Sequence, residues 1–360
     1  MSRSVTVVGG GFAALEVALA LKKSDPGIPV TVLSREKVTV YRPLLIRQPA
    51  GEPPPPVIPF ARLLDAAGVE LQDALVTAAD LDACRLTLDT GAHLEYDQLI
   101  VATGASADRD RVPGARGRAI FPCDLDGAEQ LSEATAGGGR RLAIVFGWER
   151  PGPGLEYAAW IAARRPDVPL MVIDGDGVLE SRFGPRATAW LEALFKRRGA
   201  QLMAGRRIER VTDEGVELDG ATIASEVVAL ASPLRGNTGW LSGSLLNDRG
   251  LLRVDANLAA AENVFGIGDV VAPLDGHPLA PALMSIRRLA PRLARSIAEV
   301  RGGGKPKRLL RPGRPPAMLP DLCGTALLVR DRRMLTSGRL PPLDAGQARA
   351  ALSASEGGSP

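Results

Sequence analysis

The sequence predicts an α/β protein that begins with a βαβ unit. Residues 4–8 form a Val-rich apolar run, typical of a buried strand, and three glycines follow it at once. An alanine-rich stretch over 12–23 indicates a helix, and the apolar run at 29–33 indicates the next strand. A further apolar run at 142–146, again followed by a loop and a helical stretch, predicts a second unit of the same kind.

Composition and charge are those of a globular protein with a sizeable core. The 360 residues include 44 Lys and Arg, 41 Asp and Glu, and 45% hydrophobic side chains, enough for two or three domains. Because the net charge is only +3 and aromatic residues make up 4%, we expect no nucleic-acid partner. Cys84, Cys123 and Cys323 are widely spaced and only two histidines occur, so we expect no disulfide scaffold and no metal.

The N-terminal segment resembles an export signal only superficially. Arg3 precedes an apolar stretch, but the glycines at 9–11 interrupt that stretch and Glu16 ends it. No apolar run approaches the roughly 20 residues of a membrane-spanning helix. We therefore expect a cytoplasmic protein.

The loop after the first strand has the G-x-G-x-x-A pattern of a dinucleotide-binding turn. Gly9 permits the tight turn, Gly11 lets the backbone approach a pyrophosphate, and Ala14 lets helix and strand pack closely. The phosphates would lie against free N–H groups at the start of the helix, which adds Phe12 and Ala13 to the expected site. A tight structural turn without a ligand is the alternative.

The end of the second strand departs from the usual pattern. An acid commonly stands there and binds a ribose hydroxyl, whereas this chain has Ser34 followed by Arg35. Ser34 can still hydrogen-bond a ribose, although more weakly. We expect Arg35 near the adenine or a phosphate.

Two further strand-and-turn motifs occur downstream. A strand at 96–101 runs into an A-T-G turn at 102–104, and a strand at 263–266 runs into a G-x-G-D turn at 266–269. In this order around the first βαβ unit, the motifs resemble the two-dinucleotide-binding-domain flavoproteins of the pyridine nucleotide–disulfide oxidoreductase superfamily. The resemblance covers roughly residues 4–300.

This resemblance implies FAD as the cofactor. It implies two Rossmann-like dinucleotide-binding domains, an FAD domain with an inserted NAD(P)H-type domain, plus a short C-terminal segment. Asp269 would then be the ligand of the ribitol, and Gly268 would let the backbone pass close to the flavin. Ala102, Thr103 and Gly104 would line the cofactor from the neighbouring strand.

The implied domain boundaries follow from the motif order. The FAD domain takes 1–107 and 238–300, the NAD(P)H-type domain takes 108–237, and a basic linker and C-terminal segment take 301–360. Six basic residues between 301 and 314 either bind anionic lipid headgroups or form an inert solvated linker. Because the chain lacks an amphipathic anchoring helix at its end, we expect membrane contact to be at most peripheral, at the inner membrane face.

Within the superfamily, the chain most resembles the type II NADH dehydrogenase and sulfide:quinone oxidoreductase branch. The segment V-Y-R-P-L-L at 40–45 is similar to the segment that follows the second FAD strand there, which implies Arg42 as a cofactor residue. A packed loop is the alternative. No cysteine precedes Cys84, which excludes the dithiol pair of disulfide reductases. The loop at 146–154 also lacks the cysteine that a persulfide relay needs.

The same loop leaves NADH binding open. Counting back from Gly154 puts Glu149 and Pro151 at the first two glycine positions of the expected G-x-G-x-x-G. A shifted alignment that uses Gly147, Gly152 and Gly154 restores the glycines in a longer, irregular loop.

Two acids are the candidates on the NADH side. Glu156 lies in a helix start that is similar to the G-V-E-L-A of NADH dehydrogenases. Asp174 ends the following strand, where an acid suits a ribose 2′-hydroxyl and disfavours NADP. A solvated strand end is the alternative for Asp174.

The segment after the G-x-G-D turn departs from related NADH dehydrogenases, which have glutamines near the flavin and quinone. Arg287 and Arg288 stand at those positions. An arginine near the flavin would stabilise its anionic reduced form, whereas the wet face of an amphipathic helix is the alternative. His277 is a candidate proton donor, or a structural loop histidine.

These features lead to one main hypothesis and two alternatives. The main one is an FAD-dependent oxidoreductase that moves electrons from NADH through the flavin to a quinone-like or other small organic acceptor. The first alternative keeps FAD and acts directly on a small metabolite without NADH. The second is a non-catalytic FAD-bound binding or scaffold protein. The expected partners are a small-molecule electron donor and acceptor, and a homodimer is left open.

Overall fold

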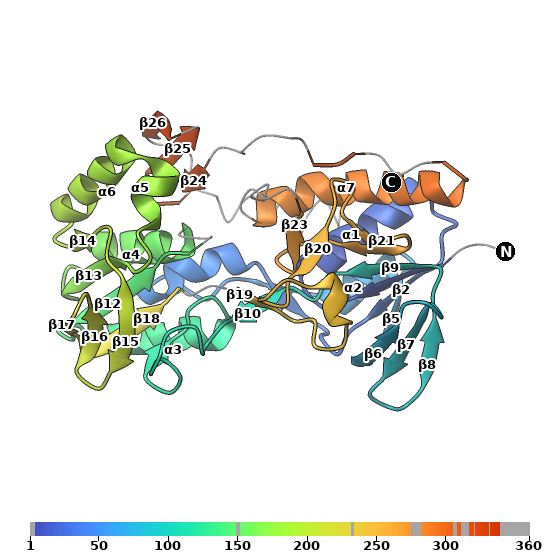
Figure 1. Cartoon of the computed structure of the whole chain (residues 1–360), viewed down its shortest axis with the longest axis horizontal. Helices are drawn as coiled ribbons and strands as arrows, with labels where there is room; N and C mark the ends of the chain where they lie inside the picture. The colour runs from blue at the N-terminus through green and yellow to red at the C-terminus, as the bar shows by residue number, and fades with distance from the viewer. Residues whose placement is uncertain are drawn as a thin grey trace. The chain divides into compact units, whose positions relative to one another are not determined.

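The chain folds into two compact units. The computed structural model describes residues 4–148, 152–231, 234–274, 282–304, 308–310, 317–319, 321–330 and 332–338 (Figure 1). The first unit comprises residues 1–40, 57–106 and 235–315, and the second comprises 41–56, 107–234 and 316–360. The units differ from the predicted boundaries chiefly in two segments, because 41–56 and the strands after 316 group with the second unit.

The first unit is built on a six-stranded sheet in the order β21-β22-β9-β1-β2-β5. All its strands run parallel except β21. From one edge to the other, the strands are β21 (Ala259–Ala261), β22 (Val264–Gly266), β9 (Gln98–Val101), β1 (Val5–Val8), β2 (Val30–Leu33) and β5 (Glu70–Gln72).

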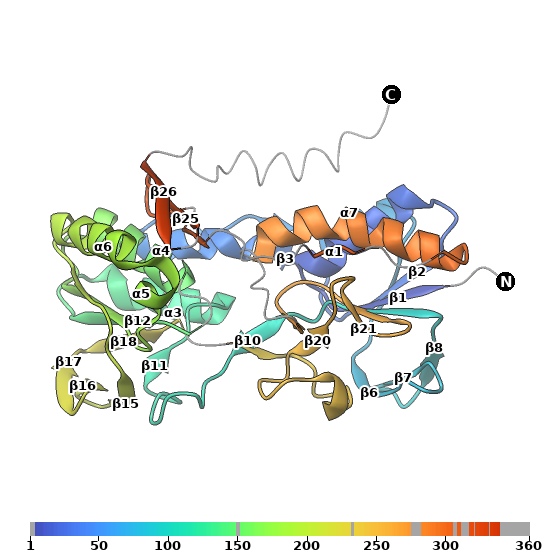
Figure 2. The same ribbon diagram turned by 45° about the horizontal axis from the view of Figure 1, so that its top comes forward.

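Two helices lie side by side against this sheet, α1 (Phe12–Ser24) and α7 (Ala282–Arg301) (Figures 1 and 2). Every residue of β1 and β9 is buried, as expected for central strands of a parallel sheet with covered faces. The helix α7 buries one apolar stripe and leaves Arg288 and Arg295 exposed. Its buried apolar residues are Ile286, Leu289, Ala290, Leu293, Ala294 and Ile297.

Smaller elements complete the first unit. They are β3 (Thr39–Val40) paired with β4 (Val57–Ile58), α2 (Phe60–Ala66), the antiparallel sheet β6 (Val76–Asp80), β7 (Arg85–Leu88) and β8 (His93–Glu95), the 3-10 helix η2 (Gly243–Leu245), and β20 (Leu252–Val254) paired with β23 (Val271–Pro273). The chain first leaves this unit over 41–56, and it leaves again along β10 (Ala105–Ala107) and returns along β19 (Leu234–Gly236).

The second unit is built on a five-stranded parallel sheet in the order β11-β18-β12-β13-β14. Its strands are β11 (Ala119–Ile120), β18 (Val227–Leu230), β12 (Leu142–Phe146), β13 (Leu170–Asp174) and β14 (Gln201–Met203). Its helices are the 3-10 helix η1 (Arg42–Ala50), α3 (Leu125–Ala136), α4 (Gly152–Arg164), α5 (Val178–Phe183) and α6 (Pro185–Arg197). Two antiparallel sheets accompany it, β15 (Ile208–Thr212), β16 (Gly215–Leu218) and β17 (Ala221–Ala224), and β24 (Ala317–Leu319), β25 (Ala326–Arg330) and β26 (Arg333–Gly338).

The two main sheets share one topology. In the first unit the chain passes from β1 through α1 to β2 and on to β5, and after β6-β7-β8 it crosses to β9 on the other side of β1. In the second unit it passes from β12 through α4 to β13 and on to β14, and after β15-β16-β17 it crosses to β18 on the other side of β12. This repeat confirms the predicted α/β fold with two Rossmann-like domains.

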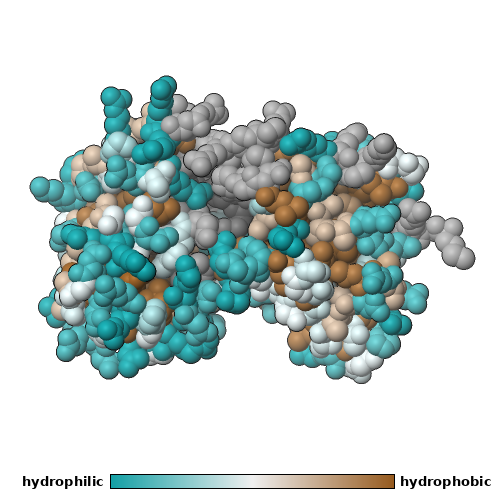
Figure 3. Space-filling view, in the orientation of Figure 1, coloured by the Kyte–Doolittle hydropathy of each residue, from teal (hydrophilic) through white to brown (hydrophobic). Residues whose placement is uncertain are grey.

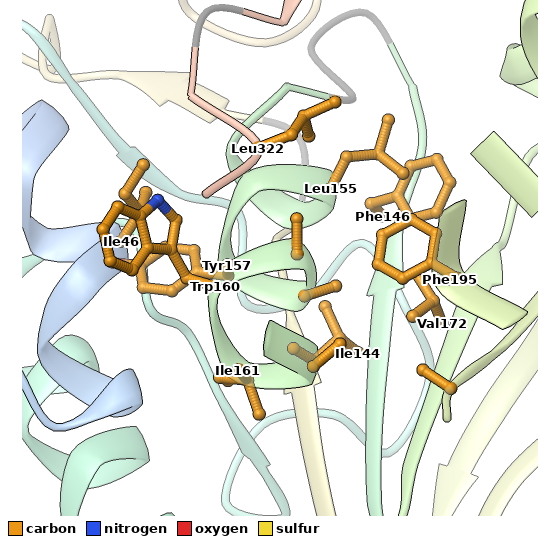
Figure 4. Close-up of a cluster of buried hydrophobic side chains, with 14 of the residues drawn as sticks. Ile46, Ile144, Phe146, Leu155, Tyr157, Trp160, Ile161, Val172, Phe195 and Leu322 are labelled. Atoms are coloured by element: carbon orange, nitrogen blue, oxygen red, sulfur yellow. The ribbon is translucent and has the colours of Figure 1, made fainter. Parts of the chain in front are cut away.

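The hydrophobic core of the second unit draws on segments far apart in the sequence (Figure 4). Side chains of α4 pack between those of β12 and those of η1, so that Ile46 lies beside Tyr157 and Trp160. Cys123 and Cys323 pack against this cluster, as small hydrophobic residues do. The labelled residues are Ile46, Ile144, Phe146, Leu155, Tyr157, Trp160, Ile161, Val172, Phe195 and Leu322.

The predicted C-terminal segment contributes directly to this core. Leu319, Leu322, Leu327 and Val329 are buried in the same cluster, and β24 and β26 contact α4 and α6. On the face drawn in Figure 3, hydrophilic residues cover most of the second unit, and hydrophobic patches are more frequent on the first. Within the described ranges, no helix combines the length and apolar composition that crossing a membrane requires.

Candidate functional site

In the first unit, the three predicted cofactor motifs meet at one edge of the sheet. Strands β22, β9 and β1 are neighbours and parallel, so the turns that follow them share their carboxyl edge. The chain switches direction between β1 and β9, which is where open α/β sheets bind ligands. Gly9 leaves β1 with φ +140°, and a Cβ there would lie 2.3 Å from the carbonyl oxygen of Ala102.

The glycine loop also lies against the end of β2. A Cβ on Gly10 would lie 2.2 Å from the hydroxyl oxygen of Ser34, which accepts a hydrogen bond from the Glu36 N–H at 2.9 Å. A Cβ on Gly11 would meet no atom of the described residues within 4 Å. Gly11 is the N-cap of α1 and, having no side chain, makes no cap hydrogen bond to this helix end. The loop is therefore closed on the protein side and open at Gly11, as a backbone pyrophosphate site requires.

The G-x-G-D turn packs on the same helix end. Gly268 has φ +92°, and a Cβ there would lie 2.9 Å from the Cβ of Ala13. The N–H of Ile267 donates to the carbonyl of Val101, which continues the pairing of β22 with β9 into the turn. Gly268, Ala13 and the A-T-G turn are thus brought together, and Asp269 is the next residue along.

The A-T-G turn carries an unsatisfied polar group. The hydroxyl of Thr103 is buried and has no hydrogen-bond partner among the described residues. The backbone of the turn is held by Asn237, whose side-chain amide donates to the Thr103 carbonyl at 3.1 Å and whose N–H donates to the Gly104 carbonyl. A buried hydroxyl without a partner at this edge fits a polar group of a ligand.

Two predicted cofactor residues have other partners. Arg35 forms an ion pair with Asp89, and Asp89 also accepts a hydrogen bond from the Leu75 N–H at 3.1 Å. Arg42 begins η1 in the second unit, where its charge lies near Tyr157 of α4. A role of either arginine toward FAD stays a prediction.

The structure separates the predicted pair of arginines on α7. Arg287 lies over the ring of Phe12 at 5.7 Å, and its Nε is 3.7 Å from a carboxylate oxygen of Glu16 on α1. Burial raises the pKa of Glu16, and the charge of Arg287 lowers it in part. Arg288 is exposed, as the amphipathic-helix alternative expects. His277 lies outside the described residues.

The second βαβ unit resembles the first but has a longer loop. Gly147 follows β12 with φ +151°, as Gly9 follows β1, and Gly154 is the third residue of α4, as Ala14 is of α1. A Cβ on Gly154 would lie 2.4 Å from the Cβ of Phe146, so this glycine lets α4 pack closely on β12. The spacing favours the shifted alignment. Glu149, Arg150 and Pro151 lie outside the described residues, and Gly152 begins α4.

Trp148 was not predicted as a special position. Its backbone is left-handed, with φ +59°, an unusual conformation for a bulky residue. Its side chain is buried in a second hydrophobic cluster that includes Val145 and Ile173. A left-handed bulky residue at this loop is a feature that often accompanies function, and no sequence pattern signals it.

Asp174 is turned into the protein. It is fully buried, and its carboxylate accepts hydrogen bonds from the N–H groups of Val178 at 2.9 Å and Leu179 at 3.0 Å, at the start of α5. Burial raises the pKa of Asp174, and these backbone bonds lower it in part. The carboxylate at this strand end is therefore neither solvated nor exposed toward a ribose.

Glu156 is half-buried and lies in a polar network that the sequence did not reveal. Its carboxylate accepts a hydrogen bond from the Asp321 N–H at 3.2 Å. Asp321 in turn accepts from Arg47 and from the indole of Trp160. Burial raises the pKa of Glu156 to about 8, the Asp321 N–H lowers it, and the Asp321 charge raises it.

The sequence pattern of the pyridine nucleotide-disulphide oxidoreductase family matches residues 3–294. The chain belongs to this family. Relatives of this oxidoreductase include an NADH dehydrogenase-like protein of Mycobacterium tuberculosis, 28% identical over 293 residues that cover 74% of this chain and 72% of the relative. Another is the ferredoxin–NAD(+) reductase component of the p-cumate 2,3-dioxygenase system of Pseudomonas putida, 28% identical over 285 residues that cover 76% and 68%.

Solved structures show the same fold at lower identity. The sulfide:quinone oxidoreductase of Aquifex aeolicus superposes with a TM-score of 0.74 at 19% identity and covers 98% of this chain and 90% of its own. NDH2 of Plasmodium falciparum, solved with NADH, superposes with a TM-score of 0.75 at 14% identity and covers 98% and 95%.

Family membership confirms the resemblance seen in the sequence and the prediction of an FAD-dependent NAD(P)H oxidoreductase. The first unit fits FAD on its own geometry, because the glycine loop is closed toward the protein and open at Gly11, and because Thr103 offers a buried hydroxyl that bonds to none of the described residues. The residue assignments stay predictions.

Proposed function

We propose that this oxidoreductase takes electrons from NADH and passes them through FAD to a quinone-like or other small organic acceptor. FAD, when bound, supplies the redox chemistry, accepting a hydride and releasing electrons. The observation that carries the proposal is the meeting of the Gly9 loop, the A-T-G turn and the Gly268 turn at one sheet edge.

The first unit would hold FAD. Gly9, Gly11 and the N–H groups of Phe12 and Ala13 would bind the pyrophosphate, where the helix end favours negative charge. Ala14 would keep α1 close to β1. Ser34 and Arg35 would bind the adenosine end of FAD. Ala102, Thr103 and Gly104, which form the A-T-G turn, would line the cofactor. Gly268 and Asp269 would bind its ribitol. The role of Arg287 is to place a positive charge beside Phe12 at this helix end.

The second unit would receive NADH. Gly147 and Gly154 shape the turn and the start of α4, and Glu156 is the acid on the NADH side. The relatives include an NADH dehydrogenase-like protein and a ferredoxin–NAD(+) reductase component, which supports a nicotinamide donor. We propose a cytoplasmic site of action with at most peripheral membrane contact, and we leave a homodimer open.

An anaerobic titration of the purified protein with NADH tests this function. The flavin absorbance band should bleach at stoichiometric NADH, and dithionite serves as the control for a reducible flavin. Protein that contains no FAD and cannot be reconstituted with it would sink the whole proposal. A band that NADH leaves unchanged and dithionite bleaches would remove NADH alone.

One observation favours a second candidate, an FAD enzyme that acts on a small metabolite without NADH. The loop after β12 is longer than the loop after β1, and Trp148 within it has a left-handed backbone. In that case the flavin would be reduced by a metabolite and not by NADH, which the same titration decides.

The cofactor assignment has its own test in Gly11→Val. Because a Cβ at Gly11 meets no atom of the described residues within 4 Å, this variant should fold normally. It should lose FAD, because the new side chain would clash with the pyrophosphate. Gly239→Val is the matched control, since Gly239 is exposed and its Cβ also meets nothing within 4 Å. Full FAD content in Gly11→Val would contradict the assignment.

A further inference from the structure

The strand registers of the two main sheets explain why Asp174 is buried. In the first unit, Val8 ends β1 and pairs with Leu33, so Ser34 is the first residue beyond the paired strands. In the second unit, Phe146 ends β12 and pairs with Asp174 itself. Asp174 is therefore the counterpart of Leu33 and lies one residue short of the position where an acid commonly binds a ribose. Because successive side chains of a strand point to opposite faces, this offset accounts for a carboxylate that faces inward.

The Asp174 carboxylate instead organises the loop that follows β13. It accepts hydrogen bonds from the N–H groups of Val178 and Leu179, and the backbone of Asp176 also hydrogen-bonds to it. Gly175 is closed toward the protein, because a Cβ there would lie 2.8 Å from a side chain of β12. The side chain of Asp176 is exposed. Asp176 is therefore the first residue after β13 that can offer a carboxylate to a ligand.

Asp176 lies against the loop that follows β12. A Cβ on Gly147 would lie 3.2 Å from the Cβ of Asp176 and 3.3 Å from its backbone nitrogen. The N–H of Gly175 donates to the carbonyl of Phe146 at 2.8 Å, which holds the two loops together. In dinucleotide-binding domains, the pyrophosphate lies at the loop after the first strand, and an acid near the end of the second strand binds the ribose. The contact with Gly147 gives Asp176 the position that this arrangement requires.

A positively charged residue lies opposite Asp176. Asp176 and Arg207 form an antiparallel β-bridge, and both residues are exposed. Residues directly opposite each other in such a bridge have neighbouring side chains. The adjacent Arg206 forms an ion pair with Asp219 at 3.4 Å. An arginine in this place attracts a phosphate, whereas a carboxylate repels a phosphate and accepts hydrogen bonds from hydroxyl groups.

We propose that Asp176 binds the adenosine ribose hydroxyls of NADH and that its charge excludes the 2′-phosphate of NADPH. Arg207 supplies an attraction for that phosphate, which Asp176 offsets. The inference rests on the proposed function, because it assigns a contact within the NADH site of the second unit. It places the choice between the two nucleotides at an exposed acid two residues after the buried Asp174.

Calorimetric titration of the oxidised, FAD-bound protein with NAD⁺ and with NADP⁺ tests this assignment without turnover. The original protein should bind NAD⁺ more tightly. Asp176→Asn should weaken the binding of NAD⁺ and strengthen that of NADP⁺, each by roughly tenfold, because it removes both a charged acceptor and a repulsive charge. The double variant Asp176→Asn/Arg207→Gln should keep the loss for NAD⁺ and lose the gain for NADP⁺.

Asp213→Asn is the matched control for the change in charge. Asp213 directly follows β15, whose other end lies next to Arg207, and it forms an ion pair with Arg118 at 2.7 Å. This variant should leave both affinities unchanged. Because Asp176 and Asp213 are both exposed, thermal unfolding should show both variants to be as stable as the original protein. A control that strengthens NADP⁺ binding as much as Asp176→Asn does would show an effect of net charge and overturn the proposal.

The two nucleotides also separate a failure of this inference from a failure of the proposed function. If NADH bleaches the flavin and Asp176→Asn leaves the ratio of the two affinities unchanged, the inference is wrong and the proposed function remains. An original protein that prefers NADP⁺ would likewise overturn the inference and leave Arg207 as the determinant. If neither nucleotide binds and NADH does not bleach the flavin, the proposed NADH site and this inference are both wrong.

Discussion

The backbone of Gly9 lies directly against the carbonyl group of Ala102. A Cβ at Gly9 would lie 2.3 Å from that oxygen, and the backbone there has φ +140°, which disfavours side chains in any case. Two strands that are almost a hundred positions apart in the sequence thus end in contact, main chain against main chain. The floor of the proposed FAD site is therefore fixed by backbone and not by side chains.

Gly9→Ala should lower the free energy of unfolding by roughly 2 kcal/mol or more, because both strain and a backbone clash oppose the new methyl group. Gly104→Ala is the matched control. It has φ +68° and open space around its Cβ, so only strain of about 1 kcal/mol applies. Urea unfolding followed by circular dichroism measures both, and equal losses would contradict the clash.

Gly154→Val should destabilise the second unit, since its side chain would overlap Phe146 and Ala231 where α4 packs on the sheet. We expect a loss of roughly 2–3 kcal/mol, typical of overpacking in a core. Gly137→Ala is the control, because Gly137 ends α3 with a right-handed backbone and its Cβ meets nothing within 4 Å. Thermal unfolding of the two variants should differ clearly, and a Gly154→Val protein as stable as the control would refute the close approach.

Asp174→Asn should reduce stability without changing the choice between NADH and NADPH. The buried carboxylate accepts N–H groups at the start of α5, and an amide can replace only part of that, at a cost of about 1–3 kcal/mol. Denaturant unfolding compares the stability of Asp174→Asn with that of the original protein. The rates of flavin reduction by NADH and by NADPH are measured for both proteins. A changed ratio between the two nucleotides with unchanged stability would restore the ribose role that the sequence suggested.

Stability should fall as the pH rises from about 5 to about 8 through the contribution of Glu156. Burial raises the pKa of this group from 4.5 to about 8, so in that range the folded protein binds a proton that the unfolded chain has lost. The contribution is fully present below the unfolded pKa and is lost as the pH passes the folded one. Thermal melting of Glu156→Gln should show a flatter dependence on pH over this window. A slope unchanged from the original protein would show that Glu156 is not buried as a neutral acid.

Local patterns in the sequence were enough to predict the first βαβ unit. The strand before Gly9 and the helix after Gly11 leave few other ways to place those residues. The glycine positions themselves indicate where the backbone must approach a neighbouring strand or a ligand closely. The motif order then predicted the family, because three turns with separate chemical requirements occur in a fixed succession.

Contacts over long sequence separations could not be predicted in the same way. Arg47 and Asp321 are 274 positions apart, and neither stands in a motif. An acid at the end of a strand gives the same sequence pattern whether it binds a ribose or caps the next helix. The burial of Asp174 therefore could not be predicted from the sequence. The left-handed backbone of Trp148 was hidden for a similar reason, since only the surrounding structure forces a bulky residue into it.

The burial of residues from β24 and β25 determines where the protein can be cut into fragments. The family pattern ends at residue 294, yet Leu319, Leu322, Leu327 and Val329 are buried among residues of α4 and its neighbours. A fragment cut where the recognisable sequence stops would carry an uncovered apolar surface on α4 and α6, and such surfaces favour aggregation. The boundary of sequence similarity and the boundary of the folding unit are thus different places in this chain.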